Sequence, residues 1–338
     1  MGVTELKTTY KKNWIVYITL LIVFAVLTAC GNNEAQKNSE SSKDNNKASE
    51  AYTVEHAMGK TEIPGKPEKV VILTNEGTEA LLAMDVKPVG AVQSWLGDPW
   101  YEHIAQDMEG VENVGLESEP SLEKIAALKP DLIIGTKIRH EKIYEKLSTI
   151  APTVYSETLR GDWKENFKLY AEAIDKEEKG KEVLDQFDGR IAELKEKLGE
   201  KTNQEVSVVR FMAGTTRIYY TDSFSGVIFE ELGFKRPEHQ EKFFTADNNL
   251  GKLAAEVGKE AIPEMDGDVL FYFTYAPNGD KEAISTLESW TSDPLWNNLS
   301  AVKEGNAHEV SDATWNTAGG VKAANIMLDD IEKIFLGQ

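Results

Sequence analysis

A charged, proline-free segment at residues 162–201 predicts two helices in the middle of the sequence and so limits the folds that this chain can adopt. Its apolar residues recur every three or four positions, so they share one helical face, with Glu, Lys and Asp on the other. Gly180 and the charged residues before it predict a break, so the second helix covers about 177–199 and spans roughly 30 Å. Asp162, with Glu165 three residues later, predicts a capping box at the start. The apolar stripe consists of Trp163, Phe167, Tyr170, Ile174, Leu184, Phe187, Ile191, Leu194 and Leu198.

The segments on either side of this helical run repeat one order of elements. The sequence SLEKIAALKPDLII at 121–134 aligns without gaps with GKEAIPEMDGDVLF at 258–271. Short apolar strands that alternate with helices are typical of parallel sheets covered on both faces. We therefore predict an α/β fold of two parallel-sheet, Rossmann-like lobes joined by a single long helix, with a ligand cleft between the lobes. The expected strands are 69–73, 89–92, 131–135, 153–155, 206–211 and 268–272.

The first residues predict a secreted protein with a lipid anchor. Lys7, Lys11 and Lys12 precede an apolar run at 14–29, which ends in the sequence LTACG. A basic start, a short apolar core and small residues at the end are the features of a secretory signal peptide. Cysteine at the cut resembles the lipobox of bacterial lipoproteins, which implies cleavage before Cys30 and lipidation of its thiol. A transmembrane anchor is the alternative, although the run is slightly short for a membrane span.

Composition sets the remaining boundaries, because residues 31–50 carry almost no apolar side chains and predict a flexible tether. The predicted organisation is a signal peptide at 1–29, the lipidated cysteine and polar tether at 30–51, an N-terminal α/β lobe at 52–160, linking helices at 161–203 and a C-terminal α/β lobe at 204–338.

Charge and residue usage exclude several classes of function. The formal net charge of −20 argues against nucleic-acid binding, which needs a basic surface. One cysteine rules out an intramolecular disulfide, and five scattered histidines argue against a zinc or manganese site in direct contact with the protein. The sequence also lacks a Gly-x-Ser-x-Gly elbow, a Walker loop and a His-Glu-x-x-His pair, so we expect no enzymatic activity.

The lipobox, the polar tether, SLEKIAALKPDLII, the long linking helix and GKEAIPEMDGDVLF together resemble the helical-backbone class of substrate-binding lipoproteins, over the whole chain from Cys30 onward. Members of that class deliver iron–siderophores, haem or cobalamin to ABC importers. The segments RFMAGTTRIY at 210–219 and WNTAGG at 315–320 resemble the Gram-positive branch that binds hydroxamate or citrate-based siderophores.

In this family one glutamate on each lobe docks onto arginines of the permease. The matching positions are Glu123 and Glu260, which also coincide in the internal repeat. Two distant carboxylates can report the geometry of the lobes to a symmetric dimeric partner. Ordinary solvated helix charges are the alternative.

Ligands of parallel α/β lobes bind at the carboxyl ends of the strands, which directs attention to two cationic segments. Arg139 and His140 follow the strand at 131–135, and Arg210, Arg217 and Tyr219 lie on and after the strand at 206–211. Guanidinium groups donate bidentately to carboxylate or hydroxamate oxygens. His140 can instead belong to the following helix, and Arg210 can instead pair with a buried carboxylate.

Three aromatic residues are candidate apolar walls of the cleft. Trp95 follows the second strand, Tyr275 follows the strand at 268–272, and Trp315 precedes a helix. Packing in the core is the alternative for each tryptophan.

We therefore expect an extracellular lipoprotein, anchored on the outer face of a Gram-positive cell membrane, that captures a ferric siderophore as a monomer and delivers it to an ABC permease with its ATPase. The expected ligand is of the hydroxamate or citrate–hydroxamate type. The chelate holds the iron, so no cofactor and no direct metal ligand are expected. The alternatives are a haem, cobalamin or ferric-catecholate binder of the same class, or a surface sensor or adhesin without transport.

Overall fold

The computed structural model describes residues 50–337, so the predicted signal peptide, Cys30 and nearly all of the tether lie outside the described residues. Within that range no helix is long and apolar enough to cross a membrane. An antiparallel hairpin of β1 (Tyr52–His56) and β2 (Gly59–Ile63), not predicted from the sequence pattern, precedes the first sheet.

The first sheet has six strands in the order β6-β5-β4-β3-β7-β8. All neighbouring pairs are parallel except β5 and β6, and the strands at the centre are buried on both faces, as their continuous apolar sequences predict. The strands are β3 (Val70–Ile72), β4 (Gly90–Gln93), β5 (Glu112–Leu116), β6 (Glu119–Pro120), β7 (Leu132–Thr136) and β8 (Thr153–Ser156).

The second sheet has five strands in the order β11-β10-β9-β12-β13. Strands β9, β12 and β13 are parallel, whereas β10 turns back from β9 and runs antiparallel to both β9 and β11. The strands are β9 (Val206–Met212), β10 (Thr215–Tyr219), β11 (Ala254–Val257), β12 (Val269–Thr274) and β13 (Ala307–Glu309).

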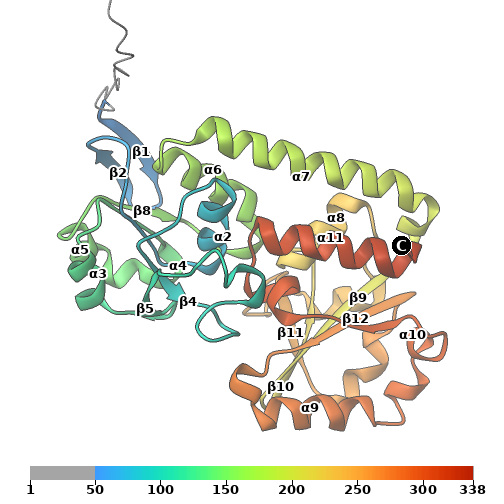
Figure 1. Cartoon of the computed structure of the whole chain (residues 1–338). Coiled ribbons are helices and arrows are strands. Elements are labelled where there is room, and N and C mark those ends of the chain that lie inside the picture. The colour runs from blue at the N-terminus through green and yellow to red at the C-terminus, as the bar shows by residue number, and fades with distance from the viewer. Residues whose placement is uncertain (1–49, 338) are drawn as a thin grey trace, which may run out of the picture. The chain divides into compact units, whose positions relative to one another are not determined.

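α-Helices connect several of these strands, as Figure 1 shows. The segment at 260–265, which the sequence predicts as a helix, belongs to a 3₁₀ helix (Lys259–Met265) that contains Pro263. The α-helices are α2 (Asn75–Ala83), α3 (Leu122–Leu128), α4 (Lys137–His140), α5 (Tyr144–Ser148), α6 (Trp163–Ala173), α7 (Glu177–Leu198), α8 (Phe224–Leu232), α9 (Lys281–Thr291), α10 (Ser300–Lys303) and α11 (Val321–Leu336).

Two helices join the lobes, as predicted, but their boundary differs in detail. The break falls at Asp175, whose backbone is left-handed with φ 55°, and Gly180 lies inside α7. A Cβ atom at Gly180 would lie 2.5 Å from Cβ of Ala171, so this glycine lets α6 and α7 pack closely. The predicted capping box is absent from the start of α6, because the Asp162 carboxylate accepts a hydrogen bond from the Thr158 hydroxyl instead.

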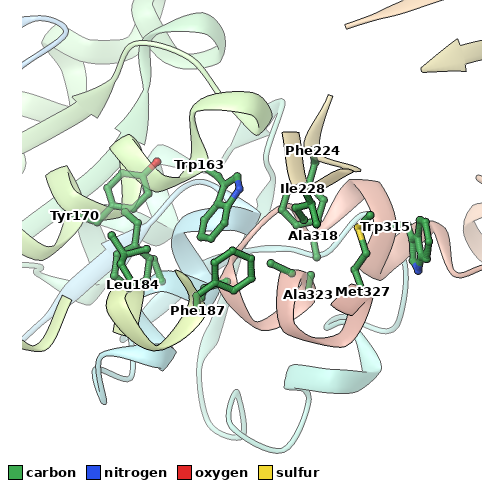
Figure 2. Close-up of a cluster of buried hydrophobic side chains, with 14 of the residues drawn as sticks. Trp163, Tyr170, Leu184, Phe187, Phe224, Ile228, Trp315, Ala318, Ala323 and Met327 are labelled. Carbon is green, nitrogen blue, oxygen red and sulfur yellow. The ribbon is translucent and has the colours of Figure 1, made fainter. Parts of the chain in front are cut away.

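One continuous apolar core connects the two lobes through the linking helices. Figure 2 shows Trp163 and Phe187 of α6 and α7 facing side chains of α8 and α11. The ring of Trp163 meets Phe187 edge-on at 5.1 Å and Phe224 at 6.3 Å between centroids. The same cluster includes Val70 and Ile134 of the first sheet and the second-sheet residues Val206, Val208, Phe271 and Phe273.

Polar contacts add to this core where α2 of the first lobe meets α11 of the second. The buried carboxylate of Glu79 accepts a hydrogen bond from the backbone N–H of Ala323 at 2.9 Å, close to the start of α11. Its other oxygen lies 2.5 Å from Nε2 of His103. Lys322 of α11 also forms an ion pair with Asp107 of the first lobe, so this pair and the Glu79–Ala323 bond both hold α11 against the first lobe.

Truncation of Phe187 tests the role of the linking helix in stability. We expect Phe187→Ala to lower the free energy of unfolding by about 3–5 kcal/mol, because it removes a buried ring and leaves a cavity among Trp163 and its neighbours. Gln186→Ala, on the exposed face of the same helix, should change it by less than about 0.5 kcal/mol. Urea unfolding measures both, and equal effects of the two substitutions would contradict the packing argument.

Candidate functional site

A cavity of about 180 Å³ lies between the lobes, at the carboxyl ends of strands from both sheets. Its walls include three of the six arginines of the chain, Arg139, Arg160 and Arg210. The other lining residues are Asn75, Glu76, Trp95, Glu117, Leu159, Met212, Tyr275, Asn316, Thr317, Ala318 and Gly319.

Arg139 extends from α4 and is held by an acid from the turn between β5 and β6. Its Nε lies 2.6 Å from Oε1 of the buried Glu117, and its guanidinium stands 5.4 Å from the ring of Trp95. The second oxygen of Glu117 accepts bonds from the backbone and side-chain nitrogens of Asn75, at 2.9 and 2.7 Å. These contacts fix the orientation of Arg139 and leave its side chain partly exposed to the cavity.

Arg210 reaches the cavity from β9 and is almost fully buried. Its Nε donates to Asp312 at 2.6 Å, its Nη2 donates to the same carboxylate at 3.2 Å, and its Nη1 donates to the Tyr219 hydroxyl at 3.1 Å. Burial by itself would lower the pKa of Arg210, but Tyr219 and Asp312 outweigh burial and raise it. Tyr275 covers one face of the guanidinium at 4.7 Å. The paired, stacked group therefore stays charged.

Arg160 differs from the other two because no carboxylate within residues 50–337 forms an ion pair with its side chain. It follows β8 in a left-handed conformation with φ 73°, and its backbone N–H donates to Glu76 at 3.0 Å. Burial lowers the pKa of Arg160, and the nearby charges of Arg139 and Arg210 add to that effect. An anion in the cavity would stabilise the charged form of Arg160 against both burial and the repulsion by its neighbours.

Glu76 is the only carboxylate that lines the cavity without pairing with a guanidinium of the described chain. Thr74 caps α2 directly after β3 and so places Glu76 in the first turn of that helix, 6% exposed. One oxygen accepts bonds from Asn166 at 2.7 Å and from the Tyr170 hydroxyl at 3.1 Å. Burial raises the pKa of Glu76 to about 7, despite these donors.

Asn316 contributes an amide whose oxygen has no hydrogen-bond partner in the described chain, although the residue is buried. It lies in a π-helical turn at 313–317, where the wider backbone turn changes which side chains face inward. A buried polar atom without a partner beside a cavity is a place where a ligand can bond.

Four of the eight predicted ligand residues line the cavity: Trp95, Arg139, Arg210 and Tyr275. Tyr219 lies one layer behind it, where its buried hydroxyl accepts from Arg210. Tyr219 therefore positions an arginine of the wall and does not form the wall itself.

The structure contradicts the predicted positions of His140, Arg217 and Trp315. His140 is buried behind the wall, where it accepts from the Thr136 N–H at Nδ1 and bonds the Glu117 carbonyl through Nε2 at 2.7 Å. Burial lowers the pKa of His140, so the imidazole is a neutral support.

Arg217 lies on β10, one strand further from the cavity than Arg210, and its Nη2 donates to Glu256 of β11 at 2.6 Å. Trp315 is fully buried between Phe229 and Phe271, and its indole nitrogen donates to Asp330 at 2.8 Å. Both residues are therefore outside the cavity wall.

Sequence reasoning missed Arg160, Glu76, Glu117 and Asn316. Ligands bind at the carboxyl ends of parallel strands, and Glu76 lies just after such an end, that of β3. The same rule applied to β8 would have identified Arg160. Glu117 and Asn316 gave no comparable signal, because their roles depend on contacts between distant segments.

The two predicted docking glutamates occupy equivalent places in the two lobes. Glu123 lies in the first turn of α3, before β7, and Glu260 lies in the 3₁₀ helix before β12. Both are exposed, and neither forms an ion pair within the described chain. No group of three or more His, Cys, Asp or Glu side chains in that part of the chain could hold a metal ion.

Known proteins resemble this chain over most of its length. It is 56% identical over 325 residues to the probable siderophore-binding lipoprotein YfiY of Bacillus subtilis, which covers 95% of this chain and 98% of that protein. It is 30% identical over 324 residues to the Fe(3+)-citrate-binding protein YfmC of the same organism, covering 95% and 97% of the two chains.

A similar solved structure is Staphylococcus aureus SirA complexed with staphyloferrin B, at a TM-score of 0.76 and 37% identity, covering 84% of this chain and 98% of that one. The model of the periplasmic binding protein family matches residues 70–312. With two α/β lobes, a helical link and a cavity at the facing strand ends, this chain belongs to the periplasmic binding protein family.

Proposed function

We propose that this protein captures a ferric siderophore outside the cell and delivers it to an ABC importer for iron uptake. The observation that carries the proposal is the cavity with arginines from both lobes, Arg139 and Arg160 from the first and Arg210 from the second. In a chain of net charge −20, half of its arginines gather at one site that can attract an anion.

The chemistry of the wall favours a ligand with anionic oxygens and some apolar surface. Guanidinium groups donate bidentately to carboxylate or hydroxamate oxygens, and the partner acids hold Arg139 and Arg210 in place before a ligand arrives. Trp95 and Tyr275 offer ring faces beside those charges. This combination supports the citrate–hydroxamate class of ferric chelates expected from the sequence, with Arg160 as an additional contact.

The names of related proteins support a ferric siderophore or ferric citrate as the ligand. They include a probable siderophore-binding lipoprotein, a ferric-citrate-binding protein and an achromobactin-binding periplasmic protein of Dickeya dadantii, 31% identical over 272 residues. Because the structurally similar SirA was solved in complex with staphyloferrin B, ferric staphyloferrin B is the first chelate to test.

We further propose that the protein acts as a monomer on the outer face of a Gram-positive membrane, anchored through a lipid on Cys30. The LTACG sequence and the name of the related lipoprotein support this location. Glu123 and Glu260 would then dock the loaded protein on the permease, one from each lobe, because both are exposed and free of ion pairs in the described part of the chain.

Neutralisation of Arg160 tests the proposed ligand site. We expect Arg160→Gln to weaken the binding of ferric staphyloferrin B by roughly tenfold to a hundredfold, because charge-assisted hydrogen bonds contribute about 1.5–3 kcal/mol each. Isothermal titration calorimetry of the full chain in detergent measures the affinity. A ferric catecholate and haemin, tested in parallel, distinguish the proposed ligand from its alternatives.

The matched control is Arg217→Gln, which removes the same charge from the same kind of side chain outside the cavity. Its affinity should remain within about twofold of the wild type. Equal losses in the two variants would mean that net charge acts at a distance, and would contradict a contact between Arg160 and the ligand.

Charge reversal of the exposed glutamates tests docking separately from binding. We expect the double variant Glu123→Lys with Glu260→Lys to abolish uptake of radiolabelled iron by cells that lack their own copy, because like charges would face the permease arginines. Affinity for the chelate should stay unchanged. The control is Glu145→Lys with Glu288→Lys, an equal change at two other exposed glutamates; loss of uptake there would argue against specific docking.

A further inference from the structure

The charge balance of the cavity depends on one carboxylate. Three guanidinium groups, those of Arg139, Arg160 and Arg210, face this region. Glu117 and Asp312 neutralise the first and the last through ion pairs. When Glu76 is ionised, the formal charges of the three arginines and the three carboxylates sum to zero. When Glu76 is protonated, the sum is one positive charge. The protonation state of Glu76 therefore decides whether the empty cavity has a net charge that favours an anion.

Groups from every side hold the Glu76 carboxylate in place. The linking helix α6 supplies the amide of Asn166 and the hydroxyl of Tyr170, and the segment after β8 supplies the backbone N–H of Arg160. The Glu117 carboxylate, which is bonded to the neighbouring residue Asn75, opposes the negative charge of Glu76.

The remaining charges near Glu76 are occupied elsewhere. On its own helix, Glu79 bonds His103 and the start of α11, and Lys322 of α11 bonds Asp107. No cationic side chain of residues 50–337 thus forms an ion pair with Glu76, and its ionised form is stabilised by neutral donors alone.

We propose that Glu76 makes capture proton-linked, so that the anionic ferric chelate enters the cavity together with one proton, taken from the solvent onto the Glu76 carboxylate. The inference rests on the proposed function. An anion placed beside Glu76 adds a repulsive charge in a buried site, and the protonated acid removes that repulsion. It also leaves the positive charge of Arg160 available to the ligand.

The direction of the pH dependence follows from linkage. Burial raises the pKa of Glu76 to about 7 in the free protein. A bound anion raises it further, so the complex holds more protons than the free protein between those two pKa values. Affinity is therefore constant below about pH 7 and falls as the pH rises above it, by at most about tenfold per pH unit.

The experiment compares the wild-type full chain with Glu76→Gln by calorimetric titration of ferric staphyloferrin B at pH 6, 7 and 8, each in two buffers of different ionisation enthalpy. We expect the wild type to take up close to one proton at pH 8 and Glu76→Gln to take up none. The ratio of the wild-type to the variant dissociation constant should rise from near 1 at pH 6 to about tenfold at pH 8. Protonation of the chelate itself changes both dissociation constants by the same factor and so cancels in that ratio.

The matched control is Glu172→Gln. Glu172 lies on α6 outside the cavity, and burial raises the pKa of its carboxyl too. Its removal should leave the proton count and the pH slope of binding unchanged.

A second variant, Tyr170→Phe, keeps Glu76 and removes one of its donors. Because that bond favours the ionised form, the pH at which affinity begins to fall should move upward. This result does not require Glu76→Gln to fold.

Four results would overturn the inference. Equal proton uptake by the wild type and Glu76→Gln would assign the proton to another group. Binding by the wild type without proton uptake, or a pH profile unmoved by Tyr170→Phe, would reject proton-linked capture and leave the proposed function intact. Failure of the wild type to bind any ferric chelate at all three pH values would overturn the proposed function and the inference together.

Discussion

The packing of Trp163 and Phe187 between the two lobes holds the lobes in a fixed arrangement. These rings join the first sheet, the linking helices and α8 in one apolar core, so the lobes cannot separate widely without exposing it to water. The close approach of α6 and α7 at Gly180 makes the link short and stiff. The strand ends that face each other across the cavity are therefore held at a defined spacing, which favours a preformed site over one assembled by large closure.

The cavity contains buried guanidinium groups both with and without carboxylate partners in the described chain. Buried guanidinium groups are costly when they are alone, and buried ion pairs are poor at attracting a third charge when they are fully satisfied. The structure combines both states, because Arg139 and Arg210 are anchored by acids while Arg160 is free of ion pairs among residues 50–337. Arg139 and Arg210 present hydrogen-bond donors in fixed positions, and Arg160 provides a positive charge that no carboxylate of residues 50–337 neutralises.

Sequence patterns predicted the architecture well, because alternation of short apolar strands with helices leaves few ways to bury both faces of a sheet. They also located the segments of the cavity, but they did not decide between adjacent residues. Arg139 faces the cavity and His140 lies behind it; Asn316 faces the cavity and Trp315 lies in the core. Arg217 was misplaced because β10 runs back antiparallel, which sets it opposite Arg210 but one strand further out. Such outcomes depend on tertiary contacts that no local pattern contains.

Glu76 connects the electrostatics of the cavity with the constraint that holds the lobes together. Two of its donors, Asn166 and Tyr170, lie on α6, the first of the linking helices, and the third is the backbone of Arg160. The same carboxylate therefore lines the cavity and is bonded to the segment that sets the spacing of its walls. A change in its charge alters the strength of those bonds as well as the field inside the cavity. The group that adjusts the attraction for an anion is thus held by the element that gives the cavity its shape.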